Sequence, residues 1–91
     1  MKSFDEVTME LNELYLAKNS DYGDSFNDLL YEFGLITVVI RLQDKMNRLK
    51  TIAKNNGEYC VKDETIRDTD ETIRDTLVDL ANYSIMALMR L

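Results

Sequence analysis

The fold is decided by the stretch VKDETIRDTDETIRDTLVDLANYSIMALMRL, residues 61–91. It contains a perfect tandem repeat, because residues 63–69 and residues 70–76 both read DETIRDT. A copied heptad is close to two helical turns, so it rotates the rest of the helix by only about 20° and moves it about 10 Å along the axis. We therefore expect one long helix that runs through both copies, with Asp63 as its N-cap.

This expected helix carries an apolar stripe and, beside it, a column of acids. The apolar residues recur at helical spacing and form the face that we expect to pack: Ile66, Ile73, Leu77, Leu80, Ser84, Ala87 and Leu91. The acids follow one another at spacings of three or four: Glu64, Asp68, Glu71, Asp75 and Asp79. Like charges so placed repel by a few tenths of a kcal/mol per pair. Either Arg67 and Arg74 offset this repulsion, or a bound cation or ligand does.

The N-terminal part of the chain predicts a first helix and then a loop. Ser3 and Glu6 have the spacing of a capping box, and apolar residues repeat at three and four, so we expect a helix over residues 4–18. The next segment, KNSDYGDSF at residues 18–26, is crowded with the residues that turns require, and we expect a loop there.

The middle of the chain predicts a second long helix over about residues 28–54, which ends before Asn56 and Gly57. Its core stripe is Leu35, Val38, Val39, Leu42, Met46, Leu49 and Ile52. Gly34 lies early in this helix, where glycine costs about 1 kcal/mol relative to alanine. Such a glycine indicates either close approach by another backbone or a local bend.

Together these segments predict an all-α fold in one domain, residues 1–91, with three helices in antiparallel order. The two long helices should pack as a hairpin, with the first helix laid across them. The chain has no proline, three glycines and 45% apolar residues, as a helical protein would. A chain this short buries only about 60 to 65% of its unfolded surface, so we expect it to assemble into a homo-oligomeric helical bundle.

The composition excludes several classes of function. A net charge of −6 argues against non-specific nucleic-acid binding. The longest apolar run, residues 35–40, ends at Arg41 and is far too short to span a membrane. The absence of histidine leaves carboxylates as the plausible metal ligands, with magnesium as the cation that they suit. Because Cys60 is the single cysteine and the start MKSFDEV has no apolar run, we expect a cytoplasmic protein.

A cluster of charges lies off the core stripe of the second helix, in the segment RLQDKMNR. Its members share one helical face: Arg41, Asp44, Lys45 and Arg48. They form either ordinary intrahelical ion pairs or a phosphate site tuned by the single acid. The aromatic residues of the preceding loop also allow two interpretations. Tyr22 and Phe26 either close the end of a helix hairpin, or Tyr22 stacks on a base or binds a phosphate.

In four of its motifs the chain resembles the phage and bacterial nucleotide modification associated domain family, type one. The family pattern is a KNxDYGxSF loop, EFGL, RxxDKxxR and DE[ST]IxDTLxDxANY, which match residues 18–26, 32–35, 41–48 and 70–83. The second DETIRDT copy is a departure from the family. It leaves open whether Glu64 and Asp68 or Glu71 and Asp75 occupy the family position, although the second copy is continuous with LVDLANY.

More remotely, the order of helices resembles that of the MazG-like all-α NTP pyrophosphatases, in which acids on two facing helices bind magnesium and water cleaves the triphosphate. The resemblance extends to the acids of the last helix. Where those enzymes carry an ExxE pair on the other helix, this chain has Arg41, Asp44 and Lys45. Exchanging acids for cations weakens metal binding and strengthens direct phosphate binding.

These residues support three hypotheses of function. The first is a phage-type protein that binds or sequesters a nucleotide or signalling nucleotide, through Lys18, Tyr22, Arg41, Lys45 and Arg48. The second is a magnesium-dependent nucleotide pyrophosphohydrolase, whose metal ligands would be Asp44, Glu71, Asp75 and Asp79. The third is a non-catalytic helical adaptor whose charged faces contact only protein.

Overall fold

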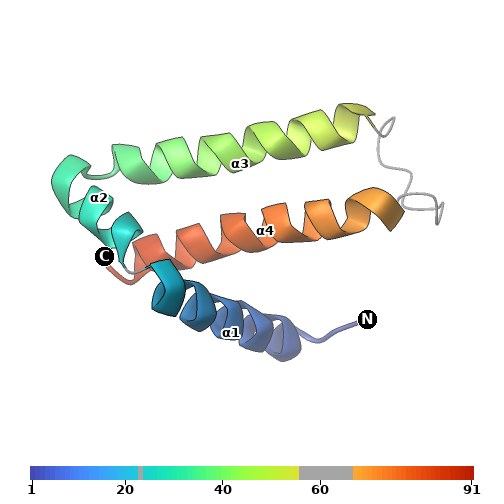
Figure 1. Cartoon of the computed structure of the whole chain (residues 1–91), viewed down its shortest axis with the longest axis horizontal. Coiled ribbons are helices and arrows are strands. Elements are labelled where there is room, and N and C mark those ends of the chain that lie inside the picture. The colour runs from blue at the N-terminus through green and yellow to red at the C-terminus, as the bar shows by residue number, and fades with distance from the viewer. Residues whose placement is uncertain (23, 56–66) are drawn as a thin grey trace.

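The computed structural model describes residues 1–22, 24–55 and 67–91, with the side chains of all of these except residues 20–22, 55 and 67–71. These ranges form the helices α1 (Phe4–Tyr22), α2 (Ser25–Phe33), α3 (Ile36–Asn55) and α4 (Arg67–Leu88), shown in Figure 1. Within them there is no strand, so the all-α prediction is confirmed. The predicted cap at Asp63 lies outside the described residues.

Helix α1 begins as predicted and ends later than predicted. The Ser3 hydroxyl accepts a hydrogen bond from the Glu6 backbone at 3.1 Å, which is one half of the capping box. The helix then continues to Tyr22, so most of the loop predicted over residues 18–26 is helical. Asparagine, serine and aspartate cost only a few tenths of a kcal/mol each in a helix. An ion pair between Lys18 and Asp79 of α4 offsets that cost.

The second predicted helix is two helices, because the chain breaks at Gly34. This residue has φ +75° and ψ −154°, a backbone conformation that is essentially restricted to glycine. Its N–H donates to the Leu30 carbonyl at 2.8 Å and closes α2, while the Thr37 hydroxyl donates to the Leu29 carbonyl at 3.1 Å. The described chain therefore has four helices where three were predicted, and the bend that Gly34 allowed for is a full break.

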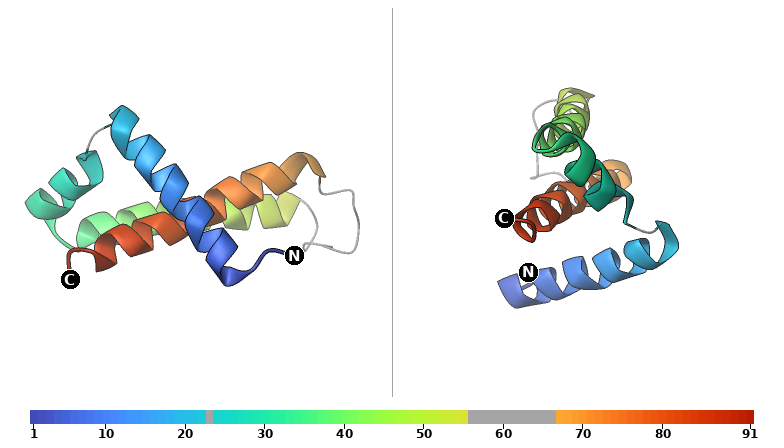
Figure 2. Two further views of the ribbon diagram at one scale, coloured as in Figure 1. Left: turned by 90° about the horizontal axis from the view of Figure 1, so that it is seen from below. Right: turned by 90° about the vertical axis from the view of Figure 1, so that its left-hand side faces the viewer.

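Helices α3 and α4 lie side by side and antiparallel, and α1 crosses α4 on the side away from α3 (Figures 1 and 2). α2 packs against α3 at one end of this pair. Few side chains of the described residues are buried: Leu11, Phe26, Thr37, Val38, Ile52 and Thr76. Phe26 also contacts Tyr83 of α4, with ring centroids 5.2 Å apart, and so holds α2 against α4.

The apolar stripes predicted from the sequence are only partly covered. Leu35, which precedes α3, remains exposed, as do Val39 and Met46 of α3 and Leu77 of α4. The molecule is elongated, with extents of 43 × 27 × 23 Å. None of the helices in the described ranges is long and apolar enough to cross a membrane.

Candidate functional site

Asp79 of α4 lies where three helices meet. Its Oδ1 accepts a hydrogen bond from the Lys18 Nζ of α1 at 2.9 Å, and its Oδ2 lies 3.1 Å from the Lys45 Nζ of α3. The side chains of Asp79 and Lys45 are 22% and 19% exposed, while that of Lys18 is 52% exposed. One carboxylate therefore joins α1, α3 and α4 through two ammonium groups.

The environment of Asp79 keeps its carboxylate ionised. Partial burial acts to raise the pKa of Asp79, but hydrogen bonds from Lys18 and Lys45 and the charges of both lysines outweigh it. The net result is that the pKa of Asp79 lies below its usual value of 3.8. At neutral pH the site therefore contains two ammonium groups bridged by one carboxylate.

Two adjoining pockets meet at this bridge, since both are lined by Lys18 and Asp79. The first has a volume of about 370 Å³ and is lined by Leu14, Lys18, Arg48, Asp75, Thr76 and Asp79. The second has a volume of about 450 Å³ and is lined by Tyr15, Lys18, Asn19, Ser25, Phe26, Lys45, Asp79, Asn82, Tyr83 and Met86. We call the two pockets together the lysine cleft. One part of it is charged, and the other is aromatic and rich in amides.

The structure brings five of the predicted site residues into this cleft: Lys18, Lys45, Arg48, Asp75 and Asp79. Arg41 and Asp44 line neither of the two pockets, although Arg41 lies one turn before Lys45 on α3. The side chains of Tyr22 and Glu71 lie outside the described residues, so their predicted roles stay predictions.

The carboxylates do not gather into an evident cation site. Among the described residues there is no group of three or more acidic or cysteine side chains placed to hold a metal ion. Asp75 and Asp79 share the first pocket, but Lys18 and Lys45 already neutralise Asp79. The predicted magnesium ligands Asp44, Glu71, Asp75 and Asp79 therefore stay a prediction.

Several cleft residues were missed as site residues at the level of sequence. Tyr15, Asn82 and Tyr83 line the second pocket, and the Asn82 amide donates to the Leu11 carbonyl at 3.3 Å, which fixes α4 to α1. Helical spacing could have identified two of them, because Asn82 and Tyr83 follow Asp79 by three and four residues and so share its helical face. Tyr15 precedes Lys18 by three residues in the same way.

The comparisons with known proteins give one match. No curated protein and no solved structure matches the chain. The remoter resemblance to the MazG-like pyrophosphatases is therefore unsupported by any match. The model of one family, nucleotide modification associated domain 1, matches residues 18–91. This range begins at Lys18 and includes most residues of the lysine cleft. The chain belongs to the nucleotide modification associated domain 1 family.

Proposed function

We propose that the chain binds a nucleotide in the lysine cleft and holds it without consuming it. The observation that carries this proposal is the convergence of Lys18, Lys45 and Arg48 on a cleft whose other end is lined by aromatic rings. Nucleotides need both features, a cationic place for phosphate and an apolar surface for the base. The family name, which refers to nucleotide modification, agrees with this class of ligand.

The charged part of the cleft suits phosphate despite the net charge of −6 on the chain. This part has two cations, Lys18 and Arg48, and two acids, and Lys45 of the adjoining pocket makes the balance of the whole cleft positive. Lys18 is half exposed and can turn from Asp79 toward a bound phosphate, whereas Lys45 is largely enclosed and keeps Asp79 paired. Arg48 presents a planar guanidinium, which binds phosphate oxygens in pairs.

The aromatic part of the cleft suits a nucleobase. Tyr15, Phe26 and Tyr83 line it, with Asn19 and Asn82 as amide donors and acceptors for a base edge. Stacking of a base on an aromatic ring contributes about 1–3 kcal/mol. The volume of about 450 Å³ falls in the usual range for small-ligand sites.

Calorimetry tests the proposal against a panel of mononucleotides, nucleoside triphosphates and cyclic oligonucleotides. Arg48→Ala should weaken binding by about one to two orders of magnitude, since a charge-assisted hydrogen bond is worth roughly 1.5–3 kcal/mol. Lys50→Ala is the matched control, because Lys50 is an exposed cation on the same helix and lines neither pocket of the cleft. The proposal fails if no panel member binds below about millimolar, or if both variants bind alike.

A second candidate function is magnesium-dependent hydrolysis of a nucleotide. The observation that favours it is the presence of Asp75 and Asp79 in one pocket with Arg48. Two carboxylates beside an arginine could hold a magnesium ion and a phosphate together. In this case Asp75→Asn abolishes product formation in the presence of magnesium.

The same variant separates the two candidates. In a protein that only holds its ligand, Asp75→Asn leaves binding largely intact, and the wild type releases the nucleotide unchanged. Product analysis by mass spectrometry after incubation with magnesium gives the decision. A wild type that neither binds nor cleaves any nucleotide would leave the helical adaptor as the remaining hypothesis.

A further inference from the structure

Part of the exposed apolar surface of the chain follows a heptad pattern on two adjacent helices. On α3 and the residue just before it, apolar positions are separated by four and three residues in alternation: Leu35, Val39, Leu42, Met46, Leu49 and Ala53. On α4 the same alternation continues to the last residue, with one serine: Ile73, Leu77, Leu80, Ser84, Ala87 and Leu91. Such spacing marks the seam between helices that pack with knobs in holes.

Each seam is only partly covered by the chain itself, although Ile73 and Leu77 of α4 also line a pocket with Leu11 of α1. Within the α3 seam Leu35, Val39 and Met46 are exposed, and within the α4 seam Leu77 and Leu91 are exposed. The α3 residues that do meet α4 and the lysine cleft lie elsewhere, at Val38, Lys45 and Ile52. The α3 seam is turned roughly 80° about the helix axis from that row.

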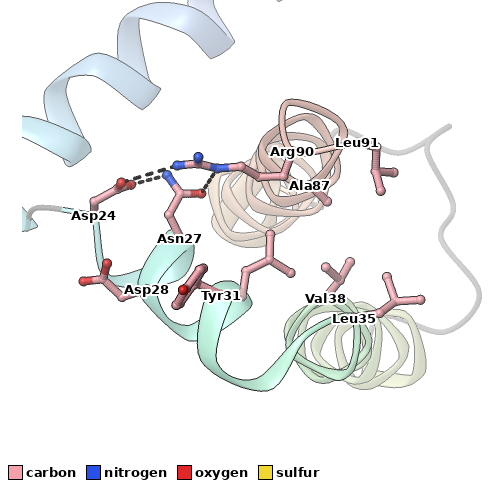
Figure 3. Close-up of a pocket in the computed structure, with 10 residues that line it drawn as sticks. Asp24, Asn27, Asp28, Tyr31, Leu35, Val38, Ala87, Arg90 and Leu91 are labelled. Atoms are coloured by element: carbon pink, nitrogen blue, oxygen red, sulfur yellow. Dashed lines mark hydrogen bonds and ion pairs between the residues drawn. The ribbon is translucent and has the colours of Figure 1, made fainter.

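The two seams lie on the same side of the α3–α4 pair. A groove of about 550 Å³ is lined on one side by residues of α3 and α4 and the positions next to them, namely Leu35, Val38, Ala87, Arg90 and Leu91, and on the other side by Asp24 and the α2 residues Asn27, Asp28, Leu30 and Tyr31. Figure 3 shows the side chains of Leu35, Val38, Ala87 and Leu91 facing the space between the two helices, with Tyr31 of α2 at its wall. Both seams therefore border one groove at this end of the pair.

This side is separate from the lysine cleft. On α4 the seam is turned roughly 120° about the helix axis from Asp79, which faces the cleft. In the right-hand view of Figure 2, α1 lies on the side of α4 away from α3, and α2 lies at the end of the α3–α4 pair that faces the viewer.

The accessible surface of the whole chain is larger than that of a compact monomer of the same mass. A compact monomer of 10.6 kDa has an accessible surface of about 5,500 Å². The whole chain has 7182 Å², which is about 1,700 Å² more over its entire surface. Obligate dimers bury roughly 1,000–2,500 Å² on each partner.

We propose that the α3 and α4 seams form the interface with a second copy of this chain, so that two hairpins pack into a four-helix bundle. A second copy offers the same heptad spacing on two antiparallel helices, which makes the face complementary to itself about a two-fold axis. The lysine cleft of each copy stays open on the outer side. The proposal does not rest on nucleotide binding.

Sedimentation of the full chain at concentrations from 1 to 100 µM tests the interface. The test variant and its control are both substitutions in α3. The wild type should sediment as a dimer. Val39→Glu places a charge within the α3 seam at a side chain that is 52% exposed in the single chain, so it should give a helical monomer. Ile40→Glu is the control, because Ile40 is 60% exposed but lies off the seam, and this variant should remain a dimer.

If Val39→Glu fails to fold, methionine oxidation in the wild type tests the interface instead. Met46 lies in the seam and is 43% exposed in the single chain, while Met9 on α1 is 63% exposed and lies outside the seam. Hydrogen peroxide should oxidise Met46 at least tenfold more slowly than Met9 in the wild type, as read by mass spectrometry of peptides. Equal oxidation rates, a monomeric wild type, or disruption by Ile40→Glu equal to that by Val39→Glu would each overturn the proposal.

Discussion

Asp79 has more influence on the architecture than any other charged residue that the structure describes. It binds Lys18, which is 61 positions away in the chain, and Lys45, and thereby fixes three helices relative to one another. Glu10 makes a comparable set of bonds with Lys2 and Arg74. Hydrogen bonding by Lys2 lowers the pKa of Glu10, but its pairs are solvent-exposed and such pairs contribute little to stability. The side chain of Asp79 is more buried than that of Glu10, so its ion pairs contribute more to stability.

We expect Asp79→Asn to lower the free energy of unfolding at pH 7 by about 1 kcal/mol, since one charge-assisted bridge is lost and Lys45 stays enclosed. Because folding lowers the pKa of Asp79, the stabilisation by its charge is present above its usual pKa of 3.8. That stabilisation disappears as the pH falls from this value through the lower pKa of the folded state.

Urea unfolding at pH 7, 5 and 3 measures this difference between the wild type and Asp79→Asn. The difference should be the same at pH 7 and 5 and shrink toward pH 3. Asp44→Asn serves as the control, because Asp44 is exposed and lies outside the lysine cleft. A difference that does not depend on pH would show that the ion pairs of Asp79 do not stabilise the fold.

At the scale of the helices, the break between α2 and α3 has one identifiable cause, the backbone conformation of Gly34. A Cβ on Gly34 would meet no atom within 4 Å, so the site has room for a side chain. The constraint comes from the backbone alone, since φ +75° with ψ −154° is strained for any residue with a side chain. Gly34 therefore sets the direction in which α2 leaves α3, and with it the position of Phe26 against Tyr83.

We expect Gly34→Ala to destabilise the fold by about 1–3 kcal/mol, which is the cost of holding a non-glycine residue in this conformation. Glu32→Ala, at an exposed helical position nearby, should change stability by no more than about 0.5 kcal/mol. Thermal unfolding followed by circular dichroism compares the two. A Gly34→Ala variant with stronger helical signal and higher stability would mean that α2 and α3 prefer to join.

The duplicated heptad concerns α4. Deletion of residues 63–69 should leave a folded protein, because residues 70–76 repeat the same sequence immediately before Leu77. Thr76 is buried and donates its hydroxyl to the Thr72 carbonyl at 2.7 Å, and both residues remain in the deletion variant. We expect the deletion variant to sediment in the same oligomeric state as the wild type. Its unfolding midpoint should also lie close to that of the wild type. An insoluble or unfolded variant would show that the first copy packs specifically.

At the scale of the whole molecule, the proposed dimer predicts how stability depends on protein concentration. If two hairpins share the α3 and α4 seams, unfolding is coupled to dissociation, and the urea midpoint rises with total protein concentration. Each tenfold increase in concentration should raise the apparent free energy of unfolding by about 1.4 kcal/mol. A folded Val39→Glu variant should show no such dependence, and a wild type without it would not be a dimer at these concentrations.

The sequence was sufficient for features that depend on neighbours along the chain. Ser3 and Glu6 predicted the first cap, and the helical spacing of apolar residues predicted an all-α fold, because both effects act within one or two helical turns. The sequence also placed Lys45 and Arg48 on one helical face and Asp75 and Asp79 on another. It did not place these two faces together, because neither helix contains information on how the other crosses it.

Tertiary structure decided the remaining features, which join distant segments. The bond from Lys18 to Asp79 depends on how α1 crosses α4, and it keeps a turn-forming segment helical against its local preference. The break at Gly34 places Phe26 of α2 against Tyr83 of α4, a contact between distant segments that the local cost of a glycine cannot reveal. Which apolar stripe is covered likewise depends on packing. Each stripe is apolar enough to be buried, and the positions of neighbouring helices determine which one remains exposed.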